Sequence, residues 1–230
     1  DFTDMATLFQ DSDRTVPVTA SSQPVDGVND ISGLHRVLAS PAAGRRPQFT
    51  AGDGVAFDGV DDSLWSNDNI DLSATTKATV GVAYRFNSLA AAYPQVFSHG
   101  VPWPQGDGFG IGTDTAGGYI DALFPLLKVG GGSANESVPP SLTNCVTVIR
   151  GDSSASTLHG AVRAVHNGVA YTNATGSVPT GNMLNARVQL GKDILGWYSG
   201  PYTAKRAVLI GADLSVDDFN LIEAWLGEAP

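Results

Sequence analysis

The sequence is short of cysteine and of basic residues. Cys145 is the only cysteine, so the chain cannot form an intrachain disulfide. Lys and Arg total 13 against 23 Asp and Glu, which gives a net charge of −10. An acidic surface repels phosphate groups, so we expect neither nucleic acid nor anionic lipid as a partner. The acidic residues can serve solubility alone, or they can bind a cation.

The sequence also lacks a long apolar run and a leader. No stretch approaches the roughly 18 consecutive apolar residues of a membrane-spanning helix, so we expect no membrane insertion. No signal peptide is visible. Because the chain begins at Asp1 rather than Met, we expect a processed product or a piece of a longer protein.

Several catalytic motifs are missing too. The chain contains no Gly-x-Ser-x-Gly nucleophile turn, no His-Glu-x-x-His zinc motif and no Gly-x-x-x-x-Gly-Lys-Ser/Thr phosphate loop. Its 4 histidines are scattered. These absences exclude the common hydrolase, metalloprotease and nucleotide-binding signatures, and we expect no enzyme.

Alternating side chains dominate what the sequence does contain. From Ala78 to Phe86, apolar residues alternate with Thr79, Gly81, Ala83 and Arg85, which is the period of a strand with one buried face. Asn167-Gly168 predicts a tight hairpin turn between strands over 157–166 and 169–172. Further strands are predicted over 95–98, 119–127, 146–149, 187–190 and 204–210. The 230 residues therefore predict an all-β, two-sheet antiparallel sandwich.

One helix is predicted, over residues 215–227. Ser215 is a good N-cap, and Asp218 stands where it can complete a capping box. Phe219, Ile222 and Leu226 recur at helical spacing. A single helix with one apolar face after a run of strands should pack on the sandwich.

The first 54 residues are predicted to be an extended N-terminal arm that packs on or beside the sandwich of residues 55–230. This segment is polar and contains several prolines. It offers too few apolar residues to form a second core.

Three stretches of the sequence carry family resemblances. Val55-Ala-Phe-Asp-Gly-Val-Asp-Asp-Ser-Leu-Trp65 resembles the F-D-G-x-D-D signature of concanavalin A-like, laminin-G-like jelly-roll domains. The stretch from Val188 to the C-terminal helix is similar to the closing part of that family. The series from Leu8-Phe9 to Arg46-Pro47 resembles virion structural proteins of tailed bacteriophages and prophages. The resemblance implies a virion location, other virion proteins as partners and a homotrimer.

Members of the jelly-roll family include lectins and glucanases, so hydrolysis has to be weighed. The glucanases place Glu-x-Asp-x-x-Glu, or a version one residue longer, on one strand. This chain has only three Glu, at 136, 223 and 228, and the pattern is absent. Glycosidases need two carboxyl groups that flank the scissile bond. We therefore expect no catalytic residues, and a degenerate glycoside hydrolase is the least favoured function.

Two aromatic segments are candidates for carbohydrate binding. Trp103 lies between two prolines, with Gln105 and Asp107 nearby, and Trp197-Tyr198 lies in a second predicted turn. Exposed aromatic rings can stack on a sugar, while amides and carboxylates hold its hydroxyl groups. The alternative is that these rings only cover the loop ends of the sandwich.

Asp61 and Asp62 are the candidate metal ligands, because hard oxygen ligands at short spacing suit Ca²⁺. A second run, Asn67 to Asp71, offers similar groups. No cofactor is required by any motif. The leading hypothesis is a lectin-like module of a phage or phage-like particle that adheres to cell-surface glycan. A capsid decoration or fibre-assembly domain is the alternative.

Overall fold

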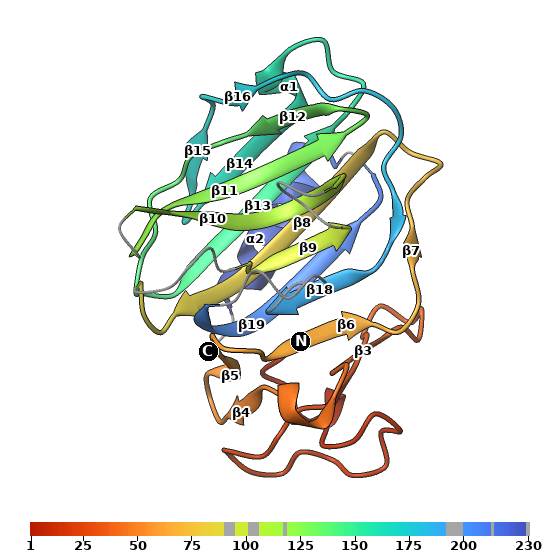
Figure 1. Cartoon of the computed structure of the whole chain (residues 1–230), viewed down its shortest axis with the longest axis vertical. Helices are drawn as coiled ribbons and strands as arrows, with labels where there is room; N and C mark the ends of the chain where they lie inside the picture. Colours follow the sequence, from red (N-terminus) through yellow and green to blue (C-terminus); the bar gives the residue numbers. More distant parts are fainter. Residues whose placement is uncertain (90–94, 101–105, 117–118, 192–199, 213, 229–230) are drawn as a thin grey trace.

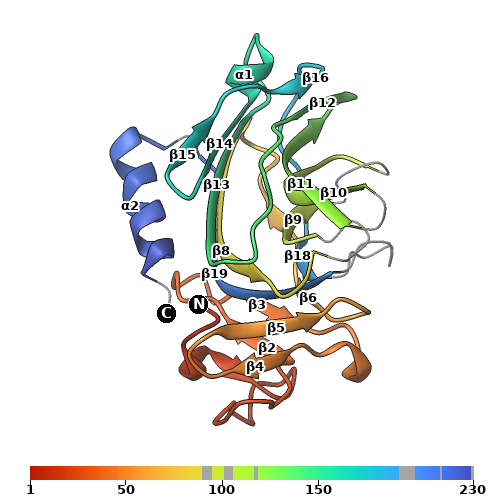
Figure 2. The same cartoon turned by 90° about the vertical axis from the view of Figure 1, so that its left-hand side faces the viewer.

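The computed structural model describes residues 1–89, 95–100, 106–116, 119–191, 200–212 and 214–228 (Figure 1). Two antiparallel sheets are stacked face to face, and one helix lies outside them (Figure 2). The predicted two-sheet sandwich with a C-terminal helix is confirmed. Within these residues, no helix combines the length and the apolar character needed to cross a membrane.

The ten-stranded sheet, called the front sheet here, contains strands from both ends of the chain. In spatial order its strands are β1 (Leu8–Phe9), β2 (Gly27–Asn29), β3 (Val37–Ala39), β6 (Ser63–Ser66), β18 (Val188–Gly191), β9 (Phe97–Gly100), β10 (Gly108–Ala116), β11 (Tyr119–Val129), β12 (Gly132–Asn135) and β16 (Thr175–Gly176).

The seven-stranded sheet, called the back sheet, has the strand predicted from Ala78 to Phe86 at its centre. Its order is β15 (Val169–Tyr171), β14 (Val162–His166), β13 (Cys145–Asp152), β8 (Lys77–Phe86), β19 (Pro201–Ile210), β5 (Gly54–Asp58) and β4 (Gln48–Thr50). A short pair, β17 (Asn185–Ala186) with β7 (Ile70–Asp71), lies at the margin.

Strand β8 shows how alternation builds the core. Val80, Val82, Tyr84 and Phe86 are buried between the two sheets. The residues between them face the other way, toward the helix. A Cβ on Gly81 would lie 2.7 Å from the Leu226 side chain, so glycine lets the helix approach closely.

The C-terminal helix α2 (Val216–Gly227) begins as predicted. Ser215 Oγ accepts a hydrogen bond from the backbone N–H of Asp218 at 3.1 Å and donates to the Asp218 carboxylate at 2.7 Å. Phe219 and Leu226 pack on Ala83 and Val148 of the back sheet. The cap and the apolar face therefore both act as the sequence indicates.

The predicted strand over 157–166 is wrong at its start. Residues 158–161 form a one-turn helix, α1 (Leu158–Ala161), and β14 begins only at Val162. The Thr157 hydroxyl accepts the backbone N–H of Gly160 at 3.1 Å, which caps the turn. Beyond it the predicted hairpin is confirmed, with positive φ at Asn167 and Gly168 between β14 and β15.

The segment 1–54, predicted as an arm, contributes strands to both sheets. Strands β1 to β3 extend the front sheet, and β4 extends the back sheet. The short 3-10 helix η1 (Met5–Thr7) precedes β1, and η2 (Ala43–Arg45) lies between β3 and β4. Leu8, Val25 and Phe49 are buried in the same core as the strands that follow. Asp53 forms ion pairs with Arg85 and with Lys205, the latter at 3.4 Å.

Candidate functional site

The outer side of the front sheet carries a group of polar residues on β6, β18 and β9. Leu64 and Leu190 belong to the core, and successive residues of a strand point to opposite faces. Their neighbours therefore face outward. We call this group the polar face; it consists of Ser63, Trp65, Gln189 and Ser98.

The strand register places these residues side by side. Gln189 pairs with Trp65 on one side and with Ser98 on the other. Ser63 lies beside Gly191, two residues along β18. The Gln189 side-chain amide donates a hydrogen bond to the carbonyl oxygen of Gly100 at 3.1 Å, which fixes its orientation.

Two hydroxyl groups of the polar face have unused hydrogen-bonding capacity. Ser63 and Ser98 are fully buried. Within the described part of the chain, neither Oγ atom has a hydrogen-bond partner. A buried hydroxyl without a partner costs about 1–3 kcal/mol, so such groups usually meet water or a ligand.

The adjoining strand β10 presents glycines on the same outer side. Phe109 and Ile111 point into the core, so glycines 108, 110 and 112 point outward. Among the described residues, no atom lies within 4 Å of where a Cβ would stand on Gly112. A side chain can therefore be added at this position without a clash at its Cβ with the described residues.

The described residues that precede the two predicted aromatic segments lie at the two ends of the polar face. Trp103, Gln105, Trp197 and Tyr198 lie outside the described residues. Their segments begin after Gly100, at the end of β9, and after Gly191, at the end of β18. These strands are antiparallel neighbours. Gly100 and Gly191 therefore lie at opposite ends of these four-residue strands, which are about 13 Å long.

Asp107, the remaining predicted ligand residue, is described and partly buried. Its Oδ2 atom accepts a hydrogen bond from the backbone N–H of Gly130 at 3.2 Å, at the turn between β11 and β12. Asp107 lies one residue before β10, which pairs with β9 through Gly108 and Gly100. It is thus at the same end of the face as the segment that contains Trp103.

At the other end of the polar face, where β18 ends, Tyr202 bonds to two neighbouring segments. Its ring stacks on Phe57 at 4.7 Å between centroids. Its hydroxyl accepts from the N–H of Gly191 at 2.8 Å and donates to the carbonyl oxygen of Val96 at 3.0 Å. Burial raises the pKa of the Tyr202 phenol far above its ordinary value, so the hydroxyl stays a donor.

A turn of three aspartates connects β5 of the back sheet to β6. Ligand oxygens of Asp58, Asp61 and Asp62 lie within 4.8 Å of one another. Asp58 Oδ1 accepts the N–H groups of Val60 and Asp61, and Asp62 Oδ2 accepts the N–H of Asp58 at 2.8 Å. The structure therefore adds Asp58 to the predicted pair of Asp61 and Asp62. The sequence had indicated Asp58 only as a turn residue.

Burial raises the pKa of Asp62 to about 6, and the charges of Asp58 and Asp61 add to the effect. Its unfolded pKa is about 3.9. The folded chain thus binds more protons than the unfolded chain between these values, and stability falls as pH rises through 6. Asp62→Asn should raise the free energy of unfolding at pH 7 by about 1–2 kcal/mol, after allowance for solvent screening.

Urea unfolding at pH 7 and at pH 4 measures this effect. The gain from Asp62→Asn should shrink at pH 4, where Asp62 of the wild type is protonated. Calcium should act in the opposite sense, because a cation shared by three carboxylates offsets their repulsion. Calcium chloride should then raise the wild-type melting temperature more than that of Asp62→Asn. Equal gains in both would argue against a calcium site here.

The sequence indicated the two aromatic segments, with Trp103 and with Trp197-Tyr198, but did not reveal the polar face. Ser63 and Ser98 each lie between buried residues of a short strand. Alternation could have assigned both to an outer face. The sequence did not show that β6, β18 and β9 are neighbours, because more than 120 residues separate Ser63 from Gln189.

No protein-family model and no curated protein matches the chain. Solved structures do. The receptor binding domain of botulinum neurotoxin D matches with a TM-score of 0.59 at 10% identity, over 86% of this chain and 50% of that one. Trypanosoma rangeli sialidase matches with a TM-score of 0.58 at 12% identity, over 97% of this chain and 33% of that one. A structure of botulinum neurotoxin type C matches at 0.50 and 10%, over 95% and 50%.

The chain spans half or less of these proteins, and the identities are low. The matches therefore show the fold: a concanavalin A-like sandwich of two antiparallel sheets with a C-terminal helix. The predicted jelly-roll resemblance is confirmed at that level. The bacteriophage part of the resemblance stays a prediction.

Proposed function

We propose that this domain is a non-catalytic, lectin-like module that binds cell-surface glycan across the polar face. The observation that carries the proposal is a pair of buried hydroxyls, Ser63 and Ser98, around the amide of Gln189; neither has a hydrogen-bond partner among the described residues. Sugars offer hydroxyl groups that both donate and accept. A few fixed polar groups beside aromatic rings are what a carbohydrate site needs.

The arrangement around the face supports the same ligand class. Trp65 is on the face, and its two ends carry Gly100 and Gly191, which precede the segments with Trp103 and with Trp197-Tyr198 in the sequence. The related fold also includes proteins described by their glycan contacts. Cell entry of botulinum neurotoxin type C depends on interaction with two ganglioside molecules. The virion location and the trimer belong to the proposal as further expectations.

Hydrolysis is the alternative raised by the aspartate turn. Retaining glycosidases hold two carboxyl groups about 5–5.5 Å apart, with one of them protonated. The three aspartates are near this spacing, and the pKa of Asp62 is raised to about 6. However, Asp58 and Asp62 each use an oxygen to hold the N–H groups of their own turn. We therefore propose binding without turnover.

Assembly through an N-terminal arm is the other alternative. An arm that clasps a neighbouring subunit has to leave its own domain. Strands β1 to β4 instead pair within this chain, and Leu8 and Phe49 are fully or almost fully buried in its core. This arrangement favours glycan binding over clasping by residues 1–54.

A glycan array with the purified chain tests the proposal. We expect specific hits, and we expect Trp103→Ala and Trp197→Ala each to weaken binding to them by about tenfold or more, which corresponds to 1.4 kcal/mol. Unchanged melting temperatures would show that both variants are folded. A blank array, or release of reducing sugar from a bound glycan, would contradict a non-catalytic lectin.

A further inference from the structure

One end of the back sheet holds a chain of polar side chains that starts in the core. Tyr84 of β8, Thr147 of β13 and His166 of β14 are fully or almost fully buried. The Tyr84 hydroxyl lies 3.1 Å from Thr147 Oγ1, which lies 2.8 Å from Nδ1 of His166. Nε2 of His166 lies 3.3 Å from Nδ2 of Asn167. The chain therefore runs from the core to the turn of the β14–β15 hairpin.

Asn167, the turn residue, decides which of these groups donate. Its Oδ1 accepts the backbone N–H of Val146 at 2.8 Å, and its own N–H donates to the carbonyl oxygen of Val146 at 2.9 Å. A backbone N–H can only donate, so Oδ1 faces Val146 and Nδ2 faces His166. Because Nδ2 also can only donate, Nε2 of His166 accepts. The proton of the neutral ring is therefore on Nδ1.

Protonation of His166 conflicts with this arrangement. A second proton on Nε2 brings two donors face to face, Nε2–H and the Nδ2–H of Asn167. If the amide turned over, Oδ1 would accept from the ring, but Nδ2 would then face the N–H of Val146. Either way the turn loses a hydrogen bond that ties it to β13.

The titratable groups that face His166 do not stabilise a charged ring. Tyr84 and Cys145 are partners across β8 and β13. Burial raises the pKa of both, so both stay neutral near pH 7. The direct partner of His166 on β15 is the apolar Val169. Burial lowers the pKa of His166 itself.

The other elements around the hairpin add no ion pair. β11 packs across the sandwich from β14 and contributes the core residues Leu123 and Leu127. From α2, a carboxylate oxygen of Glu223 lies 3.9 Å from where a Cβ would stand on Gly168 of the turn. Among the described residues, no carboxylate forms an ion pair with His166.

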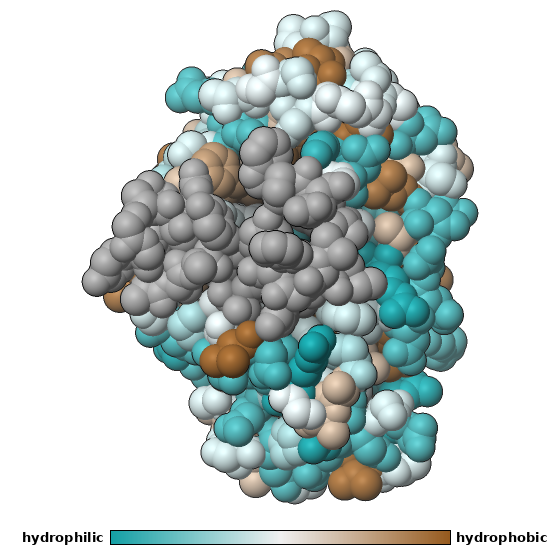
Figure 3. Space-filling view, in the orientation of Figure 1, coloured by the Kyte–Doolittle hydropathy of each residue, from teal (hydrophilic) through white to brown (hydrophobic). Residues whose placement is uncertain are grey.

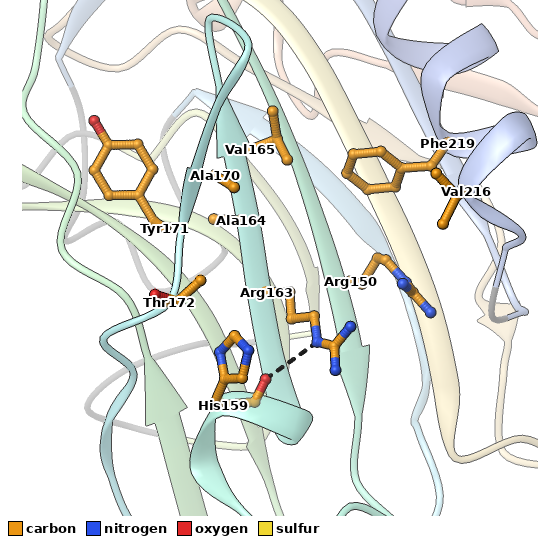
Figure 4. Close-up of a pocket in the computed structure, with 10 residues that line it drawn as sticks. All are labelled: Arg150, His159, Arg163, Ala164, Val165, Ala170, Tyr171, Thr172, Val216 and Phe219. Carbon is orange, nitrogen blue, oxygen red and sulfur yellow. Dashed lines mark hydrogen bonds between the residues drawn. The ribbon is translucent and has the colours of Figure 1, made fainter.

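The hairpin itself is lightly held. β15 is the edge strand of the back sheet, and two of its three residues are exposed. On the outer side, a cavity of about 220 Å³ is lined by Val165 and Ala170 of the hairpin and by Val216 and Phe219 of α2 (Figure 4). Missing packing contacts lower the cost of local opening. The hairpin can therefore open at a lower free energy than the central strands.

We propose that His166 and Asn167 form a pH-sensitive switch that opens the β14–β15 hairpin in acid. With His166 neutral, the Asn167 amide holds both the ring and Val146. Once Nε2 is protonated, the amide loses one of these partners, and the hairpin separates from β13 while the central strands stay paired. The switch lies on the back sheet and does not depend on the function proposed for the polar face.

The direction of the pH effect follows from linkage. In the open hairpin His166 has an ordinary pKa of about 6.5, and in the closed hairpin its pKa is lower. The open form thus binds more protons between these two values. The stability of the closed hairpin is complete above about pH 6.5 and falls as pH drops from there through the closed-state pKa.

His99 is also buried but has the opposite surroundings. Its Nε2 lies 2.8 Å from the carbonyl oxygen of Ile70. A carbonyl oxygen accepts, so a proton on Nε2 suits this bond. The conflict between two donors is found at His166 and not at His99.

Hydrogen–deuterium exchange of the full chain at pH 7 and pH 5, corrected for intrinsic exchange rates, tests the switch. We expect hairpin amides 162–171 to lose about tenfold in protection, below the ceiling of roughly thirtyfold set by the distance of pH 5 from the ordinary pKa. They should also be less protected than β8 at both pH values. His166→Gln cannot take up the proton, so its hairpin should lose no protection in acid.

Asn167→Asp tests the same switch without altering the core. Its carboxylate accepts from Nε2–H and from Val146 at once, so the pKa of His166, followed by NMR, should rise above the wild-type value. Its hairpin should keep its protection at pH 5. Asn67→Asp adds an equal charge at an exposed bend after β6 and should behave like the wild type.

Four results would overturn the switch. They are an Nε2–H tautomer of His166 by ¹⁵N NMR at pH 7, hairpin protection that does not change with pH, and an equal loss of protection in His166→Gln. The fourth is equal protection of the hairpin and β8, which would mean that the sheet opens only as a whole.

Discussion

Replacing Tyr202 by phenylalanine should lower the free energy of unfolding by about 3 kcal/mol. The substitution keeps the ring and its stacking on Phe57. It removes a hydroxyl that bonds to the N–H of Gly191 and to the carbonyl oxygen of Val96. Both groups then remain in a core where water cannot replace the lost bonds. The penalty for buried groups without partners adds to the two lost hydrogen bonds.

The same substitution should also affect the polar face. Gly191 and Val96 are the described residues at which β18 and the segment before β9 meet, and Tyr202 is bonded to both. Losing these bonds loosens the end of the face at which Gly191 ends β18. We therefore expect weaker glycan binding as well as lower stability.

Tyr171→Phe is the matched control. Tyr171 lies on the edge strand β15 of the back sheet and is only partly buried. Within the described part of the chain its hydroxyl makes no recorded hydrogen bond, so its removal should change stability by less than about 0.5 kcal/mol. Urea unfolding of both variants measures the difference. Equal, small effects would show that the Tyr202 hydroxyl does not hold these strands together.

The sequence predicted the parts of the fold that have strong local signals. The alternation over Lys77–Phe86, the Asn-Gly turn at 167–168 and the Ser215 cap each arise from neighbouring residues, so each could be found without knowing the fold. Helix α1 was missed because four residues are too few to show a helical period.

Long-range pairing explains the rest of what was missed. Strands β1 to β4 have two or three residues each, and only their partners elsewhere in the chain make them strands. The polar face depends in the same way on β6, β18 and β9 becoming neighbours. The aspartate turn is the intermediate case: local spacing named Asp61 and Asp62, but only the turn geometry brought Asp58 beside them.

The outer surface of the molecule is mostly polar in the view of Figure 3. Figure 3 shows mostly hydrophilic and neutral side chains around the part of the surface that it leaves grey. Among the described residues, the exposed large apolar side chains include Val60 and Leu142, and also Ile31 and Leu34, which are three residues apart. Single exposed apolar residues of this kind need no partner.

The central claim is that glycan binds on the outer side of the front sheet. Gly112→Leu tests it most directly, because a side chain there starts beside the polar face and its Cβ meets no atom of the described residues within 4 Å. Its strand position tolerates leucine, so folding should be preserved. Gly44→Leu is the matched control, since Gly44 also faces open space but lies in η2.

The deciding measurement is the affinity for the strongest glycan hit. It is made on wild type, Gly112→Leu and Gly44→Leu at equal melting temperature. We predict that Gly112→Leu weakens binding by about tenfold or more, while Gly44→Leu binds like the wild type. Wild-type affinity in Gly112→Leu would place the glycan elsewhere and contradict this account.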